Sequence, residues 1–142
     1  MTIYSNPSSA TGERSLAEML QAIQGLDVER GLRFASGRLD TYVRRLRKYA
    51  ASHSETANEL RAAHAYRDPV ELEHIAHNLR GVAAFLGATD LQACAAAVEM
   101  GLRSEPDWDA SAGHVESLCA THQHLLRAIG QLPAQADFEK AA

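Results

Sequence analysis

A histidine, an arginine and a glycine lie close together in a segment whose sequence predicts a helix. They are His77, Arg80 and Gly81, within the stretch ELEHIAHNLRGVAAFLGA at residues 71–88. An imidazole is substantially neutral at pH 7 and so can act as a nucleophile. On a helix, a guanidinium three residues later lies within reach of it and can neutralise anionic oxygen atoms on or near the ring. The pattern therefore indicates chemistry on an anionic group at His77.

The helical spacing predicts that His77 faces outward. Taking Leu79 as the centre of the buried face and advancing by about 100° per residue puts His77 about 160° away. Gly81 and Ala84 fall on the same outer strip. A glycine inside a helix costs about 1 kcal/mol relative to alanine. Gly81 either leaves room for a partner's surface or is merely tolerated at an exposed position, and helix geometry alone does not decide between the two.

A metal site is a weaker interpretation of the same strip. His74 precedes His77 by three residues, and Glu73 lies beside them in the sequence. Two histidines alone are not specific for a metal, and the sequence predicts no metal ligands here. A metal-binding bundle remains an alternative.

The helix that carries these residues has clear start and stop signals. Asp68 can cap it, Pro69 suits the first helical position and Glu71 completes a capping box. Gly87 suits a left-handed end.

Apolar residues spaced by three and four predict further helices on both sides. We expect two short helices at residues 15–24 and 25–37, one long helix from Arg38 to about His64, a helix opening at Thr89, and a last helix ending before Pro133. The fold class predicted is all-α: an antiparallel, up-and-down four-helix bundle with one or two short N-terminal helices packed across an end. The bundle should span residues 15–133, between flexible tails at residues 1–14 and 134–142.

Composition favours a soluble globular protein. The chain has 142 residues, 46% of them hydrophobic, and a formal net charge of −4, which argues against a general nucleic-acid binder. The basic run RRLRK at residues 44–48 is interpreted as a solvated helix face, with a binding patch as the alternative. No segment is long and apolar enough to suggest a membrane span or a signal peptide, so we expect a cytoplasmic protein. Cys94 and Cys119 are expected to be buried free thiols.

The stretch AHNLRGVAAFLGATDLQACAAAVE resembles the histidine-containing phosphotransfer (HPt) domain family. The core motif of that family is a histidine, two residues, Lys or Arg, and then glycine, which His77, Arg80 and Gly81 match in turn. The similarity covers residues 24–104 and includes Leu91 and Glu99 downstream of the motif. Asn78 departs from the pattern, since the family often has Ser or Thr at this position.

The resemblance implies a phosphoryl carrier in a bacterial two-component pathway. His77 would accept a phosphoryl group from an aspartyl phosphate on a receiver domain and pass it to another receiver, with Arg80 stabilising its charge. It also implies no ATP site and no enzyme activity in this chain, no cofactor of its own, and Mg²⁺ on the partner receiver. The expected partners are receiver domains or a hybrid sensor histidine kinase, with no nucleic acid and no membrane contact. A docking module that carries no phosphate is the alternative.

The resemblance also implies a docking surface around the phosphoacceptor. Its predicted residues are His74, Gly81, Ala84 and Phe85. Phe85 is either a half-exposed contact or packs against the neighbouring short helix. Away from this surface, His53 and His122 occupy apolar-stripe positions and are expected to be core histidines with hydrogen-bond partners.

Overall fold

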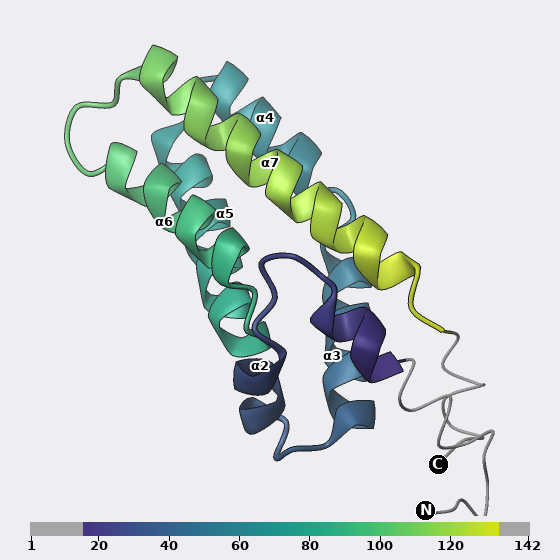
Figure 1. Cartoon of the computed structure of the whole chain (residues 1–142). Helices are drawn as coiled ribbons and strands as arrows, with labels where there is room; N and C mark the ends of the chain where they lie inside the picture. Colours follow the sequence, from purple (N-terminus) through teal and green to yellow (C-terminus); the bar gives the residue numbers. More distant parts are fainter. Residues whose placement is uncertain (1–15, 134–142) are drawn as a thin grey trace, which may run out of the picture.

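The computed structural model describes residues 16–133, which are all-helical, with no strand in that range (Figure 1). Residues 16–21 form a short helical segment. The helices that follow are α2 (Val28–Phe34), α3 (Leu39–Ser52), α4 (Thr56–Ala65), α5 (Pro69–Leu86), α6 (Thr89–Gly101) and α7 (Trp108–Gly130). The predicted tails at residues 1–14 and 134–142 lie outside the described residues, as does Ser15. The all-helical fold class is confirmed.

The longest helices enclose one hydrophobic core. α5 packs against α4 and α6, and α7 packs against the same two helices from the other side. α2 and α3 contact α5 as well and lie at one end of the elongated molecule (Figure 1). Fully buried leucines contributed by different helices form the centre of the core: Leu46, Leu60, Leu72, Leu79, Leu91 and Leu118. Among residues 16–133, no helix is long and apolar enough to cross a membrane.

The prediction of one long helix from Arg38 to His64 was wrong. The chain instead forms α3 and α4, interrupted at residues 53–55. The carbonyl of His53 accepts a hydrogen bond from Nε2 of His122 at 3.0 Å and another from the amide of Thr56 at 3.2 Å. A bond to a distant side chain thus contributes to a break in the helix that no proline or glycine signals in the sequence.

The predicted ends of α5 are confirmed. Oδ1 of Asp68 accepts a hydrogen bond from the amide of Glu71 at 3.1 Å, Pro69 begins the helix, and Gly87 ends it with a φ of 76°. These caps fix which residues the helix contains and therefore which face each of them occupies.

The C-terminal end of α5 is held by the segments that precede it in the sequence. The Tyr42 hydroxyl donates to the carbonyl of Leu86 at 2.7 Å, and the Asp27 amide donates to the carbonyl of Gly87 at 2.6 Å. A Cβ at Gly87 would collide with the Asp27 carbonyl. Only a residue without a side chain allows this close approach, which locks α5 against α2 and α3.

His122 is a core histidine, as predicted. It is fully buried in α7, where Nε2 donates to the His53 carbonyl and Nδ1 pairs with the Tyr49 hydroxyl. Since Nε2 must carry the proton for the first bond, Nδ1 accepts from Tyr49 and the ring is neutral. Burial lowers the pKa of His122 and raises that of Tyr49. His53 is only half-buried, and its Nδ1 lies 3.1 Å from the Tyr49 carbonyl.

Both cysteines are free thiols, as predicted, but the expectation that both are buried was wrong for Cys94, which lies at the edge of the core beside Thr121. Cys119 is buried and Cys94 is half-buried.

Candidate functional site

His77 projects from the outer face of α5. Its side chain is 61% exposed, whereas Ala76 and Leu79 on either side of it are buried in the core. The difference follows from helical periodicity, because Ala76 and Leu79 lie on the face of α5 that packs into the core. An exposed imidazole on a helix anchored at both ends can be reached by a large partner while its backbone stays in place.

A carboxylate from the neighbouring helix lies beside His77. Glu99 of α6 places Oε1 2.9 Å from Nε of Arg80 and 3.5 Å from Nδ1 of His77. The Glu99 side chain is only 11% exposed, compared with 40% for that of Arg80. A buried carboxylate needs such a partner to remain charged. The packing of α5 on α6 therefore holds the Glu99 carboxylate in a fixed position beside the exposed His77 and Arg80.

Two neighbours compete for Nδ1 of His77. Nη2 of Arg80 lies 3.4 Å from it and could donate only to an unprotonated Nδ1, whereas Glu99 Oε1 could only accept from a protonated one. Both contacts are long, and the one with the hydrogen-bond geometry is the arginine contact. Glu99 is nearly buried and holds the arginine through a different nitrogen, Nε, so that both groups stay beside the ring. In the tautomer with the proton on Nδ1, the lone pair is on Nε2.

The outer strip beyond His77 carries little side-chain bulk. A Cβ built on Gly81 would meet no atom within 4 Å, so packing inside the chain does not require a glycine there. Ala84, one turn further along, is half-buried. The surface next to His77 on this strip therefore carries no large side chain that would keep a partner away.

His74 is exposed and pairs with a residue of its own helix. The Asn78 amide nitrogen lies 3.2 Å from Nε2 of His74, so the amide donates and the ring accepts. In the part of the chain that the structure describes, no group of three or more His, Cys, Asp or Glu side chains is placed to hold a metal ion.

Phe85 was expected either to be a half-exposed contact or to pack against the neighbouring short helix, and it does both. It packs against α2, with its ring centroid 5.5 Å from that of Phe34, and it is still 41% exposed. Phe34 is 52% exposed. The structure thus pairs two aromatic side chains that are far apart in the sequence at one surface.

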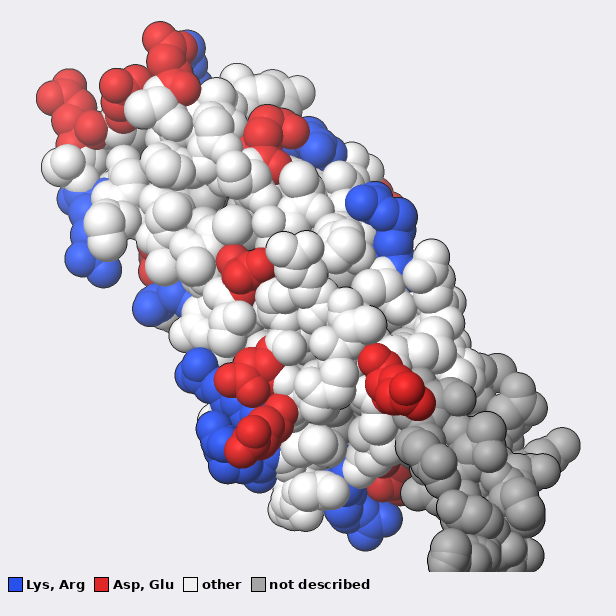
Figure 2. Space-filling model, in the orientation of Figure 1, with Lys and Arg blue, Asp and Glu red and all other residues white. Residues whose placement is uncertain are grey.

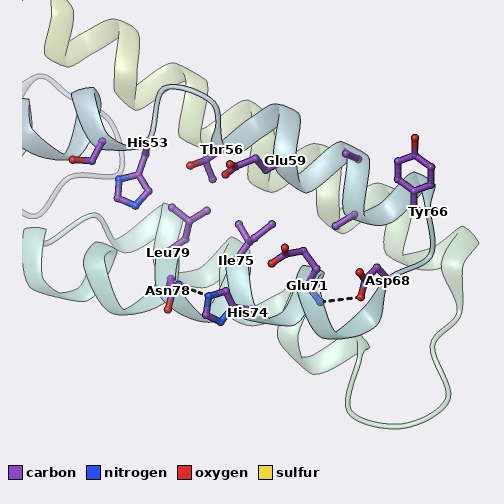
Figure 3. Close-up of a pocket in the computed structure, with 13 residues that line it drawn as sticks. His53, Thr56, Glu59, Tyr66, Asp68, Glu71, His74, Ile75, Asn78 and Leu79 are labelled. Atoms are coloured by element: carbon purple, nitrogen blue, oxygen red, sulfur yellow. Dashed lines mark hydrogen bonds between the residues drawn. The ribbon is translucent and has the colours of Figure 1, made fainter.

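A groove of about 550 Å³ runs between α4 and α5 (Figure 3). His74 and Asn78 line it from α5, and Glu59 lines it from α4. Asp68 and Glu71 add two more carboxylates at the end of the groove nearest the α4–α5 turn. The groove is the acidic side of the α5 surface.

Sequence reasoning missed two residues of this region. Glu99 was noted only as part of a family pattern, although a charged residue one position after buried Val98, on the apolar stripe of α6, was a usable signal. Phe34 carried no such signal, because its place beside Phe85 depends on how α2 packs.

A family model described as "Hpt domain" matches residues 44–141. The matched range includes His77, Arg80, Gly81 and Glu99. No match was found among curated proteins or among solved structures.

Proposed function

The chain belongs to the Hpt domain family, and from that premise we propose that it relays phosphoryl groups between receiver-domain aspartates through a phosphohistidine at His77. Hpt domains are phosphocarrier modules of phosphorelays rather than enzymes, and they interact with receiver domains and kinases. The observation that carries the proposal is the exposed His77 beside a buried Glu99 and an Arg80 tied to that carboxylate.

In the forward step, Nε2 of His77 attacks the phosphorus of an aspartyl phosphate on the partner. A nitrogen–phosphorus bond forms as the bond from phosphorus to the aspartyl oxygen breaks, and the carboxylate leaves with the electron pair. The proton on Nδ1 stays in place, facing Glu99 Oε1 at 3.5 Å. Transfer to a second receiver aspartate reverses these changes.

Glu99 and Arg80 have different roles in this mechanism. Glu99 is a positioning residue: it holds the imidazole with Nε2 outward, and it tethers Arg80 through Nε. The two Nη atoms of Arg80 then remain for the oxygen atoms of the phosphoryl group. Mg²⁺ belongs to the receiver in this scheme, and this chain supplies the nucleophile, a cation and a surface.

The docking surface proposed for the receiver includes His74, Gly81, Ala84 and Phe85. Exposure of His74 and Phe85 and the open space above Gly81 support this assignment.

The finer predictions about the chain are part of the same proposal. Short connections between α5 and α6 and between α6 and α7 support an antiparallel, up-and-down arrangement of the bundle. Three further points stay predictions. They are a bundle domain that spans residues 15–133, a bacterial pathway and a cytoplasmic location.

Phosphoryl transfer from a panel of phosphorylated receiver domains tests the proposal, with His77→Gln as the paired variant. The expected result is acid-labile, alkali-stable label on the wild-type chain alone. Label that persists on His77→Gln would move the site to another histidine. A folded wild-type chain that binds receivers without taking label would instead be a docking module.

A further inference from the structure

The groove between α4 and α5 carries carboxylates on both of its walls. Glu59 lies on α4, and Asp68 and Glu71 lie at the start of α5 (Figure 3). None of the ion pairs formed among residues 16–133 includes any of these three side chains. Carboxylates that share one groove without a cation concentrate negative potential there and attract a positively charged ligand.

The charge of the whole molecule is divided in the same sense. Residues 53–75 have five acidic residues against two basic ones, whereas residues 28–52 have seven basic residues against two acidic ones. Acidic side chains gather at the end of the molecule away from α2 (Figure 2). Of the two basic residues in the acidic part, Arg61 is paired with Glu116 of α7, and neither Arg61 nor Arg67 lines the groove. The groove is therefore not neutralised by its own segment of the chain.

A buried hydroxyl in the groove has no hydrogen-bond partner. Thr56 begins α4, is 4% exposed and lines the groove between His53 and Glu59 (Figure 3). The side-chain hydrogen bonds formed among residues 16–133 do not use its hydroxyl. In the same range only Nε of Arg47 is both sealed from solvent and unpartnered, so the Thr56 hydroxyl is open to the groove. A buried hydroxyl without a partner is destabilising, and the groove therefore needs a polar occupant at this point.

The remaining groups of the groove suit an aliphatic chain that bears N–H donors. Nδ1 of His53 lies 3.1 Å from the Tyr49 carbonyl, to which it can only donate, so Nε2 of the neutral ring is left as an acceptor. The apolar residues that line the groove are buried or half-buried and form its floor: Ala63, Ile75 and Leu79. Methylene groups pack on such a floor while a charged head at the end of the chain reaches polar partners.

We propose that the α4–α5 groove binds a linear aliphatic polyamine. One ammonium group donates to the Thr56 hydroxyl and to the Glu59 carboxylate. A second ammonium group lies at the other end of the groove, beside Asp68 and Glu71, and the methylene chain between the two packs on Ile75. Binding requires no phosphoryl transfer, so the inference does not rest on the proposed function.

The dimensions of the groove agree with this class of ligand. From Thr56 to Tyr66, which both line it, α4 advances by about 15 Å. The groove volume of about 550 Å³ lies in the range of small-molecule sites. A single metal ion fits less well, because no three His, Cys, Asp or Glu side chains of the described residues are placed to hold one.

Calorimetric titration of the full chain with spermidine, at moderate ionic strength, tests the inference. Two variants remove parts of the site at nearly constant shape: Thr56→Val replaces the hydroxyl by a methyl group, and Glu59→Gln/Glu71→Gln removes two charges. The matched control Glu73→Gln/Glu105→Gln removes two charges from exposed residues that do not line the groove. Circular dichroism and urea unfolding check that each variant is folded.

We expect one spermidine to bind per chain. Glu59→Gln/Glu71→Gln should weaken binding by about tenfold, the effect of losing two ion pairs at the surface. Thr56→Val should weaken it by about threefold to tenfold, and the control should stay within about twofold of wild type because distant exposed charges are screened. Nuclear Overhauser effects from the spermidine methylenes to the Ile75 and Leu79 methyl groups should place the chain on the floor of the groove.

Several results would overturn the inference. A folded wild-type chain that does not bind spermidine is one. Equal weakening in the control, or displacement of spermidine by Mg²⁺ at the same concentration of charge, would show diffuse attraction to an acidic surface instead of a site. A tetralysine peptide that binds more tightly than spermidine through the same residues would assign the groove to a basic protein segment. If Thr56→Val does not fold, the carboxylate variants and the Overhauser effects still decide.

Discussion

Glu99 lies 3.5 Å from Nδ1 of His77, although twenty-two residues and a helix boundary separate them in the sequence. The carboxylate is nearly buried and the imidazole is mostly exposed. A fixed anion behind a reachable nucleophile can decide which ring nitrogen keeps the proton, without itself meeting the partner.

Replacing Glu99 should therefore slow phosphorylation of His77 and change its tautomer. The hydrogen bond that Arg80 Nε donates to Glu99 joins two charged groups and is worth about 1.5–3 kcal/mol, and each 1.4 kcal/mol corresponds to a factor of about ten in rate. We expect Glu99→Ala to slow labelling by about tenfold or more, and Glu99→Gln, which keeps an oxygen acceptor, to slow it less. Nitrogen chemical shifts of the imidazole report the tautomer directly. An unchanged Nδ1–H population in Glu99→Ala would contradict the positioning role.

Arg80 should affect the rate of phosphoryl transfer through its positive charge and through the several N–H donors of its guanidinium. Arg80→Ala removes both and is expected to slow transfer from a receiver by about tenfold or more, as loss of a donor to a developing oxyanion does. Arg80→Lys keeps the charge but cannot bond Glu99 while directing two further nitrogen atoms outward, so its rate should fall between those of the other two proteins. Rapid-quench measurement of the transfer step makes the comparison. Equal rates for Arg80→Ala and wild type would remove Arg80 from the proposed mechanism.

The sequence was sufficient for α5 because all of its signals are local. The Asp68 cap, Pro69 and Gly87 set its ends, and the three-and-four spacing placed His77 outside and Leu79 inside. The break between α3 and α4 was missed because its partner, His122, comes from a helix about seventy residues away. The pairing of Phe34 with Phe85 was missed for the same physical reason. It depends on how helices pack, which spacing along one helix does not specify.

His122 should make the stability of the protein fall in mild acid. Its pKa is lowered in the folded state because burial disfavours the charged ring. The unfolded chain, with an ordinary histidine pKa of about 6.5, then binds the proton more readily. The contribution is fully present above that value and is lost as the pH falls below it, by at most about 1.4 kcal/mol per pH unit. Urea unfolding at pH 7.5 and 5.5 measures the change.

Two variants assign this pH dependence to the buried ring. His122→Asn should unfold at lower urea concentrations and show a smaller drop between the two pH values. His124→Ala, which changes an exposed histidine of the same helix, should keep the wild-type drop. Tyr49→Phe leaves Nδ1 of His122 without its donor and should cost about 1–3 kcal/mol at pH 7.5. A pH-dependent drop that is the same in His122→Asn and wild type would assign it to other groups.

Gly81 offers a test that separates stability from access, because α7 contains a matched glycine. Gly81 and Gly113 are both exposed within helices, and a Cβ on either would meet no atom within 4 Å. Alanine at either position should stabilise the fold by about 0.5–1 kcal/mol, since both glycines carry the same backbone entropy. Arginine should separate them. Gly81→Arg would place a long side chain on the outer strip beside His77 and should slow transfer from a receiver, while labelling by phosphoramidate, a donor too small to need a docking surface, is unchanged. Gly113→Arg should leave both reactions at the wild-type rate. If Gly81→Arg transfers as fast as Gly113→Arg, the glycine is merely tolerated at an exposed position and does not serve access.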